Sequence, residues 1–390
     1  MPSKVDVVAV ASDAGSGRAL APVVRRLVRN GTAVIGYASG PSGEILPQEA
    51  PEATTVALDD DCTPGAFGDL IAGSDARVVL TGAGAYNRLE HTARLAARHC
   101  GRPSIAVLDY WFEYAPRFQR VTDGRRVDSW PDVLCVPDDV AARGVVEAGG
   151  DPSRVVVTGS PNIEASRLWW DAYHPDRERL AHSLGVDPAA PIVAFFSEPH
   201  RANPDGRPFT GPGGLIRDDG SPLFGYTAEQ MLSLVMRALA DAGRRRDVRI
   251  QVIVKAHPLE WTPGLREFAA RWNDGSASVS ITEAAHPREL VALADAVVGM
   301  SSVTLIEAGL AARPTYSVQI GLGADAPFDP CVANRLGLAT PDFDVPALET
   351  FAAAIAGGTA SPPPVRPAGL RVDGATDAVA MVVNRVLAAA

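Results

Sequence analysis

Residues 294–321 read ADAVVGMSSVTLIEAGLAARPTYSVQIG, and this stretch decides the fold class. The apolar pair Val297 and Val298 indicates a buried strand, and residues 299–302 (GMSS) form a tight turn. The next apolar residues recur at helical spacing and predict a helix: Leu305, Ile306, Ala308 and Leu310. Pro314 ends this helix and leads into a second buried strand at 315–319. A strand, a helix and a strand in this order predict a parallel α/β sheet.

The turn before this helix has two interpretations. Ser301 and Ser302 place hydroxyls at the helix N-terminus, where serine is a common N-cap. The same N-terminus offers N–H groups and a partial positive charge, which bind phosphate. Glu307 lies on this helix, where its carboxylate can accept hydrogen bonds from ribose hydroxyls. We expect a nucleotide site here, with a purely structural cap as the alternative.

Composition places the chain among globular proteins. Its 390 residues suffice for two α/β domains. No apolar run approaches the roughly 18 residues of a transmembrane helix, and the start MPSKVDVVAVASD lacks the features of a signal peptide, so we expect a cytoplasmic protein. The net charge of −10 argues against a nucleic-acid partner. The four cysteines lack paired spacing, which argues against a disulfide framework or a zinc site.

The first half of the chain alternates predicted strands with helices. Continuous apolar runs, as in VDVVAV, are typical of buried parallel strands. We predict strands at 5–10, 33–37, 77–81, 104–108, 133–136 and 155–157, and helices near 18–30 and 87–99. This alternation predicts a doubly wound sheet.

The second half repeats the pattern and predicts a second Rossmann-like domain. We predict strands at 192–196, 249–254, 278–281, 296–298 and 315–319, and helices at 227–242 and 287–293. Residues 200–226 lack periodicity and are interpreted as a flap over the cleft or as a solvated insertion.

These patterns predict four parts of the chain. Residues 1–165 form an N-terminal acceptor domain, and 166–184 a helical linker. Residues 185–365 form a C-terminal donor domain, and 366–390 a C-terminal helix that can pack back across the junction.

Polar residues follow several strands of the second half. Lys255, His257 and Pro258 come directly after the strand RIQVIV, at the sheet edge where open α/β sheets bind ligands. Lys255 supplies positive charge, His257 can donate to a phosphate oxygen, and Pro258 makes the turn rigid. Ser197 and His200 follow the first strand of this half and are expected at the same edge.

In the first half, residues 12–17 form a predicted glycine-rich turn after the first strand. Only Gly15 and Gly17 are present, so the GxGxxG pattern of dinucleotide-binding proteins is absent. The turn is either a close connection between strand and helix or an acceptor pocket. In the second interpretation Ser16 and the two glycines line the pocket, and Asp13 is a candidate base.

A second cluster follows the strand SIAVL. Asp109 and Glu113 are candidate general bases, and Tyr110 and Trp111 can hold a sugar-like ring. The aromatic residues can equally belong to the domain core. Arg117 is expected either to meet an anionic acceptor or to be surface charge. Ser160, in the turn 158–162, is expected to line the cleft.

Together these motifs resemble the GT-B glycosyltransferase superfamily. The resemblance rests on two Rossmann-like halves, the TGSP and KAHP turns, and the Ser-Ser turn followed by a Glu-Ala helix. The HP and SS pair is similar to that of bacterial sialyltransferases, Kdo transferases and CDP-glycerol glycerophosphotransferases. The second half resembles UDP-N-acetylglucosamine 2-epimerases more loosely.

The resemblance implies two Rossmann-like domains that face a cleft. It implies a cytidine-activated donor whose phosphate contacts His257, Ser301 and Ser302, and whose ribose contacts Glu307. A GT-B transferase needs no metal or other cofactor, because helix N-termini and basic residues stabilise the leaving phosphate.

The expected function is therefore transfer of a glycosyl or polyol-phosphate group. The donor is a nucleotide-activated sugar or polyol, and the acceptor is a small molecule or a glycan. The alternatives are a nucleotide-sugar 2-epimerase or hydrolase of the same fold, and a non-catalytic nucleotide-sugar binder. A homodimer is compatible with each of these functions.

Overall fold

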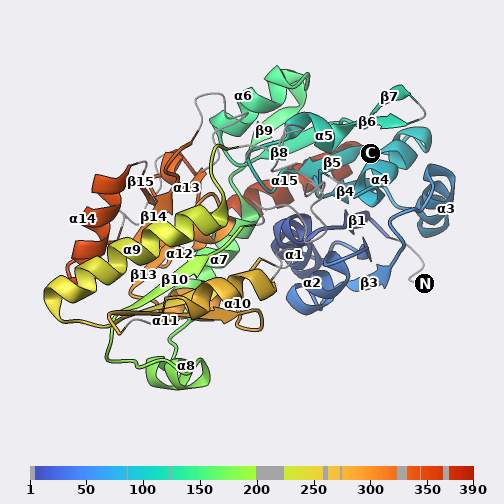
Figure 1. The fold of residues 1–390 in the computed structure, drawn as a ribbon. Coiled ribbons are helices and arrows are strands. Elements are labelled where there is room, and N and C mark those ends of the chain that lie inside the picture. The colour runs from blue at the N-terminus through green and yellow to red at the C-terminus, as the bar shows by residue number, and fades with distance from the viewer. Residues whose placement is uncertain are drawn as a thin grey trace. The chain divides into compact units, whose positions relative to one another are not determined.

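The computed structural model describes residues 5–85, 87–122, 124–198, 224–257, 262–272, 275–322, 332–342, 344–362 and 369–390. The chain divides into two compact units. The first contains the residues up to Ser166 and those from Gly369 onwards, and the second runs from Arg167 to Ala368. Each unit is built around a parallel sheet (Figure 1).

The described sheet of the first unit has seven parallel strands in the order β3-β2-β1-β4-β5-β8-β9. They are β1 (Val7–Ala11), β2 (Val34–Ala38), β3 (Thr54–Ala57), β4 (Val78–Thr81), β5 (Ser104–Val107), β8 (Val133–Val136) and β9 (Val155–Val157). The six strands that the sequence predicts for this half are all present. β3 was not predicted, because its sequence TTVA is half-exposed and lacks a continuous apolar run.

Helices cover both faces of this sheet. One face packs against α1 (Ala14–Arg29), α2 (Ser42–Glu49) and α15 (Ala375–Ala389), and the other against α3 (Pro64–Ser74) and α4 (Leu89–His99). The remaining helices are α5 (Tyr114–Phe118), α6 (Asp139–Glu147), the 3-10 turn η1 (Pro152–Arg154) and α7 (Pro161–Ala172), which runs across the boundary between the units.

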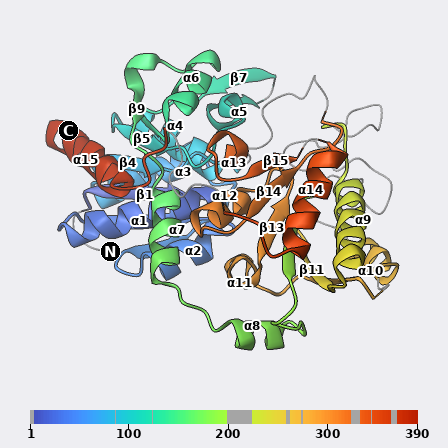
Figure 2. The same ribbon diagram turned by 90° about the vertical axis from the view of Figure 1, so that its left-hand side faces the viewer.

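The C-terminal helix α15 completes the core of the first unit. Its Val379 and Val383 are buried in the same apolar cluster as Leu20 of α1. Figure 2 shows α15 beside α1. At its start, the carboxylate of Glu164 accepts hydrogen bonds from the backbone N–H groups of Gly374 and Thr376. The last described segment of the chain is therefore part of the first unit.

α1 begins four residues before its predicted start. The prediction of a turn at 14–17 is wrong, since these residues form the first turn of the helix. The reason is a capping box between Asp13 and Ser16, which favours helix from residue 14 despite two glycines.

A two-stranded antiparallel hairpin of β6 (Gln119–Thr122) and β7 (Arg125–Asp128) follows α5. The sequence analysis did not predict it, because QRVT and RRVD carry too few apolar residues for a strand pattern.

The described sheet of the second unit has six parallel strands in the order β12-β11-β10-β13-β14-β15. They are β10 (Ile192–Phe196), β11 (Ile250–Lys255), β12 (Ala277–Thr282), β13 (Ala296–Gly299), β14 (Thr315–Val318) and β15 (Thr340–Asp342). The helices are α8 (Arg177–Ser183), α9 (Ala228–Arg246), α10 (Thr262–Ala270), α11 (Pro287–Leu293), α12 (Val303–Leu310), α13 (Val332–Arg335) and α14 (Val345–Ala356).

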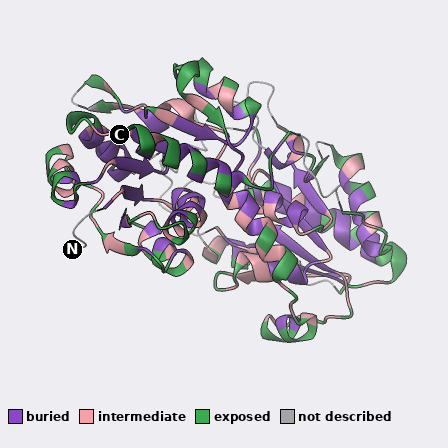
Figure 3. Cartoon of the chain, turned by 180° about the vertical axis from the view of Figure 1, so that it is seen from behind, coloured by how far each residue is buried: buried purple, intermediate pink, exposed green. Residues whose placement is uncertain are grey.

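The strands of both sheets are largely buried and the outer faces of the helices are exposed (Figure 3). The predicted fold class, two Rossmann-like domains as in the GT-B fold, is confirmed. The predicted flap at 200–226 falls mostly outside the described residues. Among the described helices, none has the length and apolar character needed to cross a membrane.

Candidate functional site

In open parallel sheets, ligands bind beyond the carboxyl ends of the strands where the strand order reverses. In the first unit this switch point lies between β1 and β4, which pair with each other. In the second unit it lies between β10 and β13. The residues that follow these strands form the candidate site in each unit.

Asp13 follows β1 and caps α1. Its Oδ1 accepts a hydrogen bond from the backbone N–H of Ser16 (2.7 Å), and the Ser16 hydroxyl accepts one from the N–H of Asp13 (3.1 Å). Its Oδ2 faces the turn after β4, since a Cβ built on Gly84 would lie 2.5 Å from it. Asp13 therefore stands at the switch point between the two turns.

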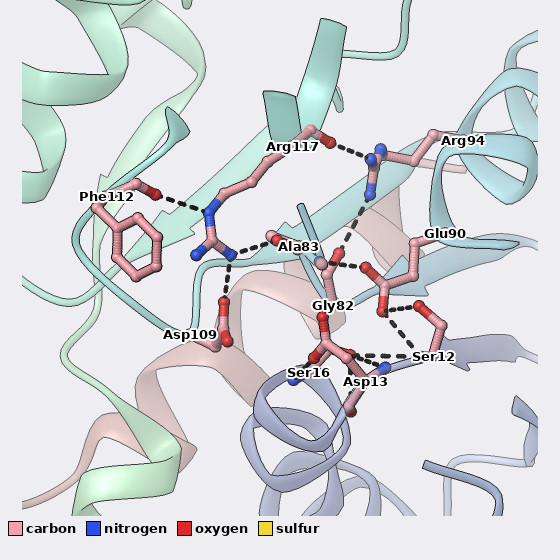
Figure 4. Close-up of polar contacts among 11 residues, drawn as sticks. Ser12, Asp13, Ser16, Gly82, Ala83, Glu90, Arg94, Asp109, Phe112 and Arg117 are labelled. Carbon is pink, nitrogen blue, oxygen red and sulfur yellow. Dashed lines mark hydrogen bonds and ion pairs between the residues drawn. The ribbon is translucent and has the colours of Figure 1, made fainter. Parts of the chain in front are cut away.

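Glu90, the second residue of α4, joins the same two turns. Its Oε1 accepts hydrogen bonds from the backbone N–H (3.0 Å) and the hydroxyl (3.0 Å) of Ser12, and its Oε2 accepts one from the N–H of Gly84 (Figure 4). The side chain is fully buried. Burial, together with the negative charge of Asp13, raises the pKa of Glu90 to about 7.

Sequence reasoning missed Glu90. A glutamate in the first turn of a helix is common, because its negative charge interacts favourably with the positive end of the helix dipole. Its burial depends on how α4 lies against the turn after β1, which the local sequence does not reveal.

Asp109 follows β5, and its carboxylate lies near Asp13, against the first turn of α1. Its Oδ1 accepts a hydrogen bond from Arg117 Nη1 (2.5 Å). Its Oδ2 lies against the first turn of α1, since a Cβ built on Gly15 would lie 2.0 Å from it. Burial raises the pKa of Asp109; the Arg117 guanidinium opposes this rise and the Asp13 charge adds to it.

Arg117 is a buried residue of the short helix α5. Its side chain is 4% exposed, so the surface-charge interpretation is wrong. Its Nε donates to the carbonyl of Phe112 (3.0 Å), and its Nη1 donates to the carbonyl of Ala83 as well as to Asp109. Contact of Arg117 with an anionic acceptor stays a prediction.

Three more predicted site residues of the first unit differ in burial and in contacts: Tyr110, Trp111 and Glu113. Trp111 is buried, and its indole N–H donates to Asp138 (2.8 Å), which caps α6. Tyr110 is half-buried and packs edge-on against Trp111. Glu113 caps α5 with a φ of 54°, a left-handed conformation that is uncommon for glutamate and is enriched at functional sites.

Gly17, in the first turn of helix α1, and Ser160, just before α7, are both tightly packed. A Cβ on Gly17 would lie 2.7 Å from the Ser42 hydroxyl. Ser160 is buried before α7, and its hydroxyl accepts from the N–H of Ile163 (3.4 Å).

At the switch point of the second unit, a carboxylate lies against the predicted phosphate-binding turn. Glu198, which follows β10, accepts hydrogen bonds from the N–H groups of Ser301 (2.6 Å) and Met300 (3.3 Å) and from the Ser301 hydroxyl. Ser302 is the N-cap of α12, with its hydroxyl accepting from the N–H of Thr304 (3.2 Å). The cap interpretation of Ser302 is thus confirmed, and nucleotide binding stays a prediction.

Lys255 and Ser197 lie on neighbouring strand ends. The N–H of Ser197 donates to the carbonyl of Lys255 (3.0 Å), and Lys255 Nζ donates to the carbonyl of Glu283 (2.7 Å). Burial lowers the pKa of Lys255. His257 is half-buried two residues further on, while Pro258 and His200 fall outside the described residues.

Glu307 forms an ion pair with Arg288 (3.3 Å), whose guanidinium lies over the ring of Trp169 (4.8 Å from the ring centroid). Both charged side chains are largely buried, so the pair fixes the carboxylate in place on α12. Within the described ranges, no three His, Cys, Asp or Glu side chains are grouped to hold a metal ion.

Comparisons with known proteins agree with this fold. No protein family and no curated protein sequence matches the chain. Among solved structures, it is similar to the UDP-GlcNAc 2-epimerase of Methanocaldococcus jannaschii (TM-score 0.67, 12% identity, 97% of this chain and 100% of that one). It is also similar to the UDP-GlcNAc 2-epimerase of Neisseria meningitidis bound to UDP-GlcNAc (TM-score 0.62, 10% identity, 98% and 100%). A glycosyltransferase of Rickettsia africae is a third (TM-score 0.57, 12% identity, 99% and 94%).

Proposed function

We propose that this protein is an enzyme that binds a nucleotide-activated sugar and transfers the sugar, or a polyol phosphate, to an acceptor without a metal ion. The fold is shared with structures of nucleotide-sugar enzymes, among them one bound to UDP-GlcNAc. At sequence identities of 10–12% the shared fold does not fix the chemistry, which depends on the residues of this chain.

The observation that carries the proposal is the contact between Glu198 and the 300–301 turn. Two backbone N–H groups and the Ser301 hydroxyl converge on one carboxylate at the switch point. A phosphate oxygen can accept from such donors, and to bind here it has to take the place of the Glu198 carboxylate. In the proposed complex a donor phosphate binds beside Ser301 and Ser302, with Lys255 and His257 adding donors from the next strand end.

The ribose is proposed to bind at Glu307. A carboxylate is a strong acceptor for two vicinal hydroxyls, and the contact with Arg288 keeps it oriented. This assignment does not identify the base of the nucleotide, and a cytidine nucleotide is the donor that the HP and SS turns favour.

The first unit is proposed to supply the acid–base chemistry. Asp13 and Asp109 lie at the end of their sheet, and a carboxylate there can remove the proton of an acceptor hydroxyl. Burial raises the pKa of Asp109, which makes it a stronger base than an ordinary aspartate.

A second candidate is epimerisation at C2 of a nucleotide sugar. The observation that favours it is Glu90, because a group with a pKa of about 7 next to the carboxylate of Asp13 can both give and take a proton at neutral pH. Epimerisation needs such a pair, whereas transfer needs one base.

A thermal-shift titration with CMP, CDP, UDP, GDP and dTDP tests nucleotide binding, because a ligand that binds only the folded protein raises its melting temperature. Stabilisation by CMP or CDP supports a cytidine-linked donor, and stabilisation by UDP redirects the search to UDP-sugars. If none of the five nucleotides stabilises the protein, the proposed site is wrong.

Two variants and one product assay complete this test. His257→Ala should weaken binding of the stabilising nucleotide at least tenfold, about 1.4 kcal/mol, while Thr359→Ala, at an exposed position after α14, should not. Incubation of the nucleotide sugar without an acceptor then separates the two functions. A C2 epimer formed without acceptor supports the epimerase, and turnover only with an acceptor supports the transferase.

A further inference from the structure

A buried polar side chain of β14 lies beside the turn to which the proposed function assigns the donor phosphate. β14 pairs with β13 so that Ser317 lies opposite Gly299, the residue before Met300. The Ser317 side chain is fully buried, although its neighbours Tyr316 and Val318 belong to the apolar core of the second unit. A buried hydroxyl destabilises the fold unless it is hydrogen-bonded. The partners of Ser317 therefore account for its place in the strand.

The nearest partner of Ser317 is the backbone of the turn. Its hydroxyl donates to the carbonyl oxygen of Met300 (2.6 Å) and lies farther from a second acceptor, Gln319 Oε1 (3.3 Å). A serine hydroxyl has a single proton to donate, so the nearer oxygen receives most of it. The Gln319 side chain is itself held by Tyr226, whose hydroxyl accepts a hydrogen bond from Gln319 Nε2 (3.1 Å). The Ser317 hydroxyl is thus directed at the Met300 carbonyl.

The Met300 carbonyl and the Ser301 N–H belong to one peptide group. This group is planar and trans, so the two bonds point in opposite directions. On the side away from Ser317, the Ser301 N–H donates to Glu198 Oε1 (2.6 Å). The peptide group is therefore held at both ends, by a hydroxyl at its oxygen and by a carboxylate at its N–H. Hydrogen bonds in series polarise one another, which makes the Ser301 N–H a stronger donor.

We propose that Ser317 is a positioning residue for the anion site that follows β13. Its hydroxyl fixes the 300–301 peptide in the orientation that presents the Ser301 N–H to an anion. In the free protein this anion is the Glu198 carboxylate. That a nucleotide phosphate takes its place in the complex rests on the proposed function, whereas the orientation of the peptide does not. Ser317 acts through this peptide and not through contact with the ligand.

NMR of the free, full chain measures the state of this peptide. Met300–Ser301 is the single Met-Ser pair in the sequence, so methionine labelled with ¹³C at its carbonyl and serine labelled with ¹⁵N give one doubly labelled peptide. Ser317→Ala should shift the Ser301 amide proton upfield, because the N–H loses its polarised hydrogen bond. Thr315→Val is the matched control, since it removes a buried hydroxyl from the opposite end of β14, where Thr315 donates to the carbonyl of Arg313 (2.8 Å). An unchanged Ser301 resonance in Ser317→Ala, or an equal shift in the control, would overturn the proposal.

Nucleotide affinity tests whether this orientation serves phosphate binding. Glu198 competes for the Ser301 N–H, so the affinities are compared in the Glu198→Gln background, from which this carboxylate is absent. In calorimetric titrations with CMP, CDP, UDP, GDP and dTDP, adding Ser317→Ala should weaken binding about fivefold, the contribution of one hydrogen bond. Adding Thr315→Val should leave the affinity unchanged. Thermal unfolding checks that each variant folds, and if Ser317→Ala does not, Ser317→Cys replaces it as a weaker donor of similar size.

The outcomes distinguish this proposal from the proposed function. If none of the five nucleotides binds, the proposed function fails, and the Ser301 resonance alone decides whether Ser317 positions the peptide. If a nucleotide binds equally well with and without the Ser317 hydroxyl, the proposed function stands and the positioning role is wrong.

Discussion

The carboxylate of Asp109 lies directly against the Cα of Gly15, so closely that a Cβ on Gly15 would stand 2.0 Å from Asp109 Oδ2. The two residues come from the end of β5 and the first turn of α1. Their contact places a buried carboxylate beside the N-terminus of a helix, where negative charge is stabilised.

Gly15→Ala should therefore destabilise the protein, although alanine normally favours a helix by about 1 kcal/mol over glycine. The added methyl group has to displace the Asp109 carboxylate from Arg117, and we expect a loss of roughly 2–4 kcal/mol. Urea unfolding measures this. Gly73→Ala in α3 is the control, since a Cβ there meets nothing within 4 Å, and it should be neutral or stabilising.

Arg117→Met should destabilise the folded protein by about 3–5 kcal/mol, because it leaves the Asp109 carboxylate buried without its cationic partner. Adding Asp109→Asn to this variant should restore part of the stability. The free energy of unfolding of the two single variants and the double variant gives the coupling. Strict additivity of the two changes would contradict the ion pair.

Glu90→Gln should change how stability depends on pH. The pKa of Glu90 is about 7 in the folded protein and near 4.5 when unfolded, so the unfolded state binds fewer protons between these values. Wild-type stability should lose on the order of 2–3 kcal/mol from this group as the pH rises from 4.5 to 7.

The glutamine variant lacks this titration. It should be less stable than wild type at pH 5, because its amide N–H₂ opposes the N–H of Gly84, but the difference should shrink by pH 8. Thermal unfolding of both proteins across this range is the measurement. A constant difference would show that Glu90 is ionised throughout.

His91→Asn should change how the stability of the protein depends on pH below 6.5. The pKa of His91 is about 4 in the folded protein against 6.5 in the unfolded state, so the unfolded state binds more protons in this window. Wild type should lose stability as the pH falls from 6.5 towards 4, on the order of 2–3 kcal/mol from this residue. Asparagine keeps an acceptor for the Ser129 hydroxyl but does not titrate, so the variant should show a smaller loss.

Most strands of the two sheets could be predicted from the sequence because they contain apolar runs, as at Ile192–Phe196, whereas β3 could not, because it lacks one. The start of α1 could not, because glycines in its first turn suggest a loop, while the capping box of Asp13 and Ser16 outweighs them. The hairpin was hidden because its residues alternate charge with little apolar character.

Some residues of the candidate sites could also be predicted from the sequence, and others could not. Asp13, Asp109 and Ser301 could be proposed because each follows a strand at the carboxyl edge of its own unit's sheet. Glu90 could not, because its importance lies in a tertiary contact with Ser12, 78 positions away. Glu198 was visible as a residue after β10, but its contact with the 300–301 turn was not.

The place of α15 has a consequence for biosynthesis. Asp377 at its start pairs with Arg26 of α1, 351 positions earlier in the chain. A ribosome that has synthesised the whole first sheet has therefore not yet made the helix that closes its core. The second unit, whose residues are continuous in the chain, can fold during translation before the first is finished. The nascent chain thus carries an open apolar surface on α1 while the second unit is made.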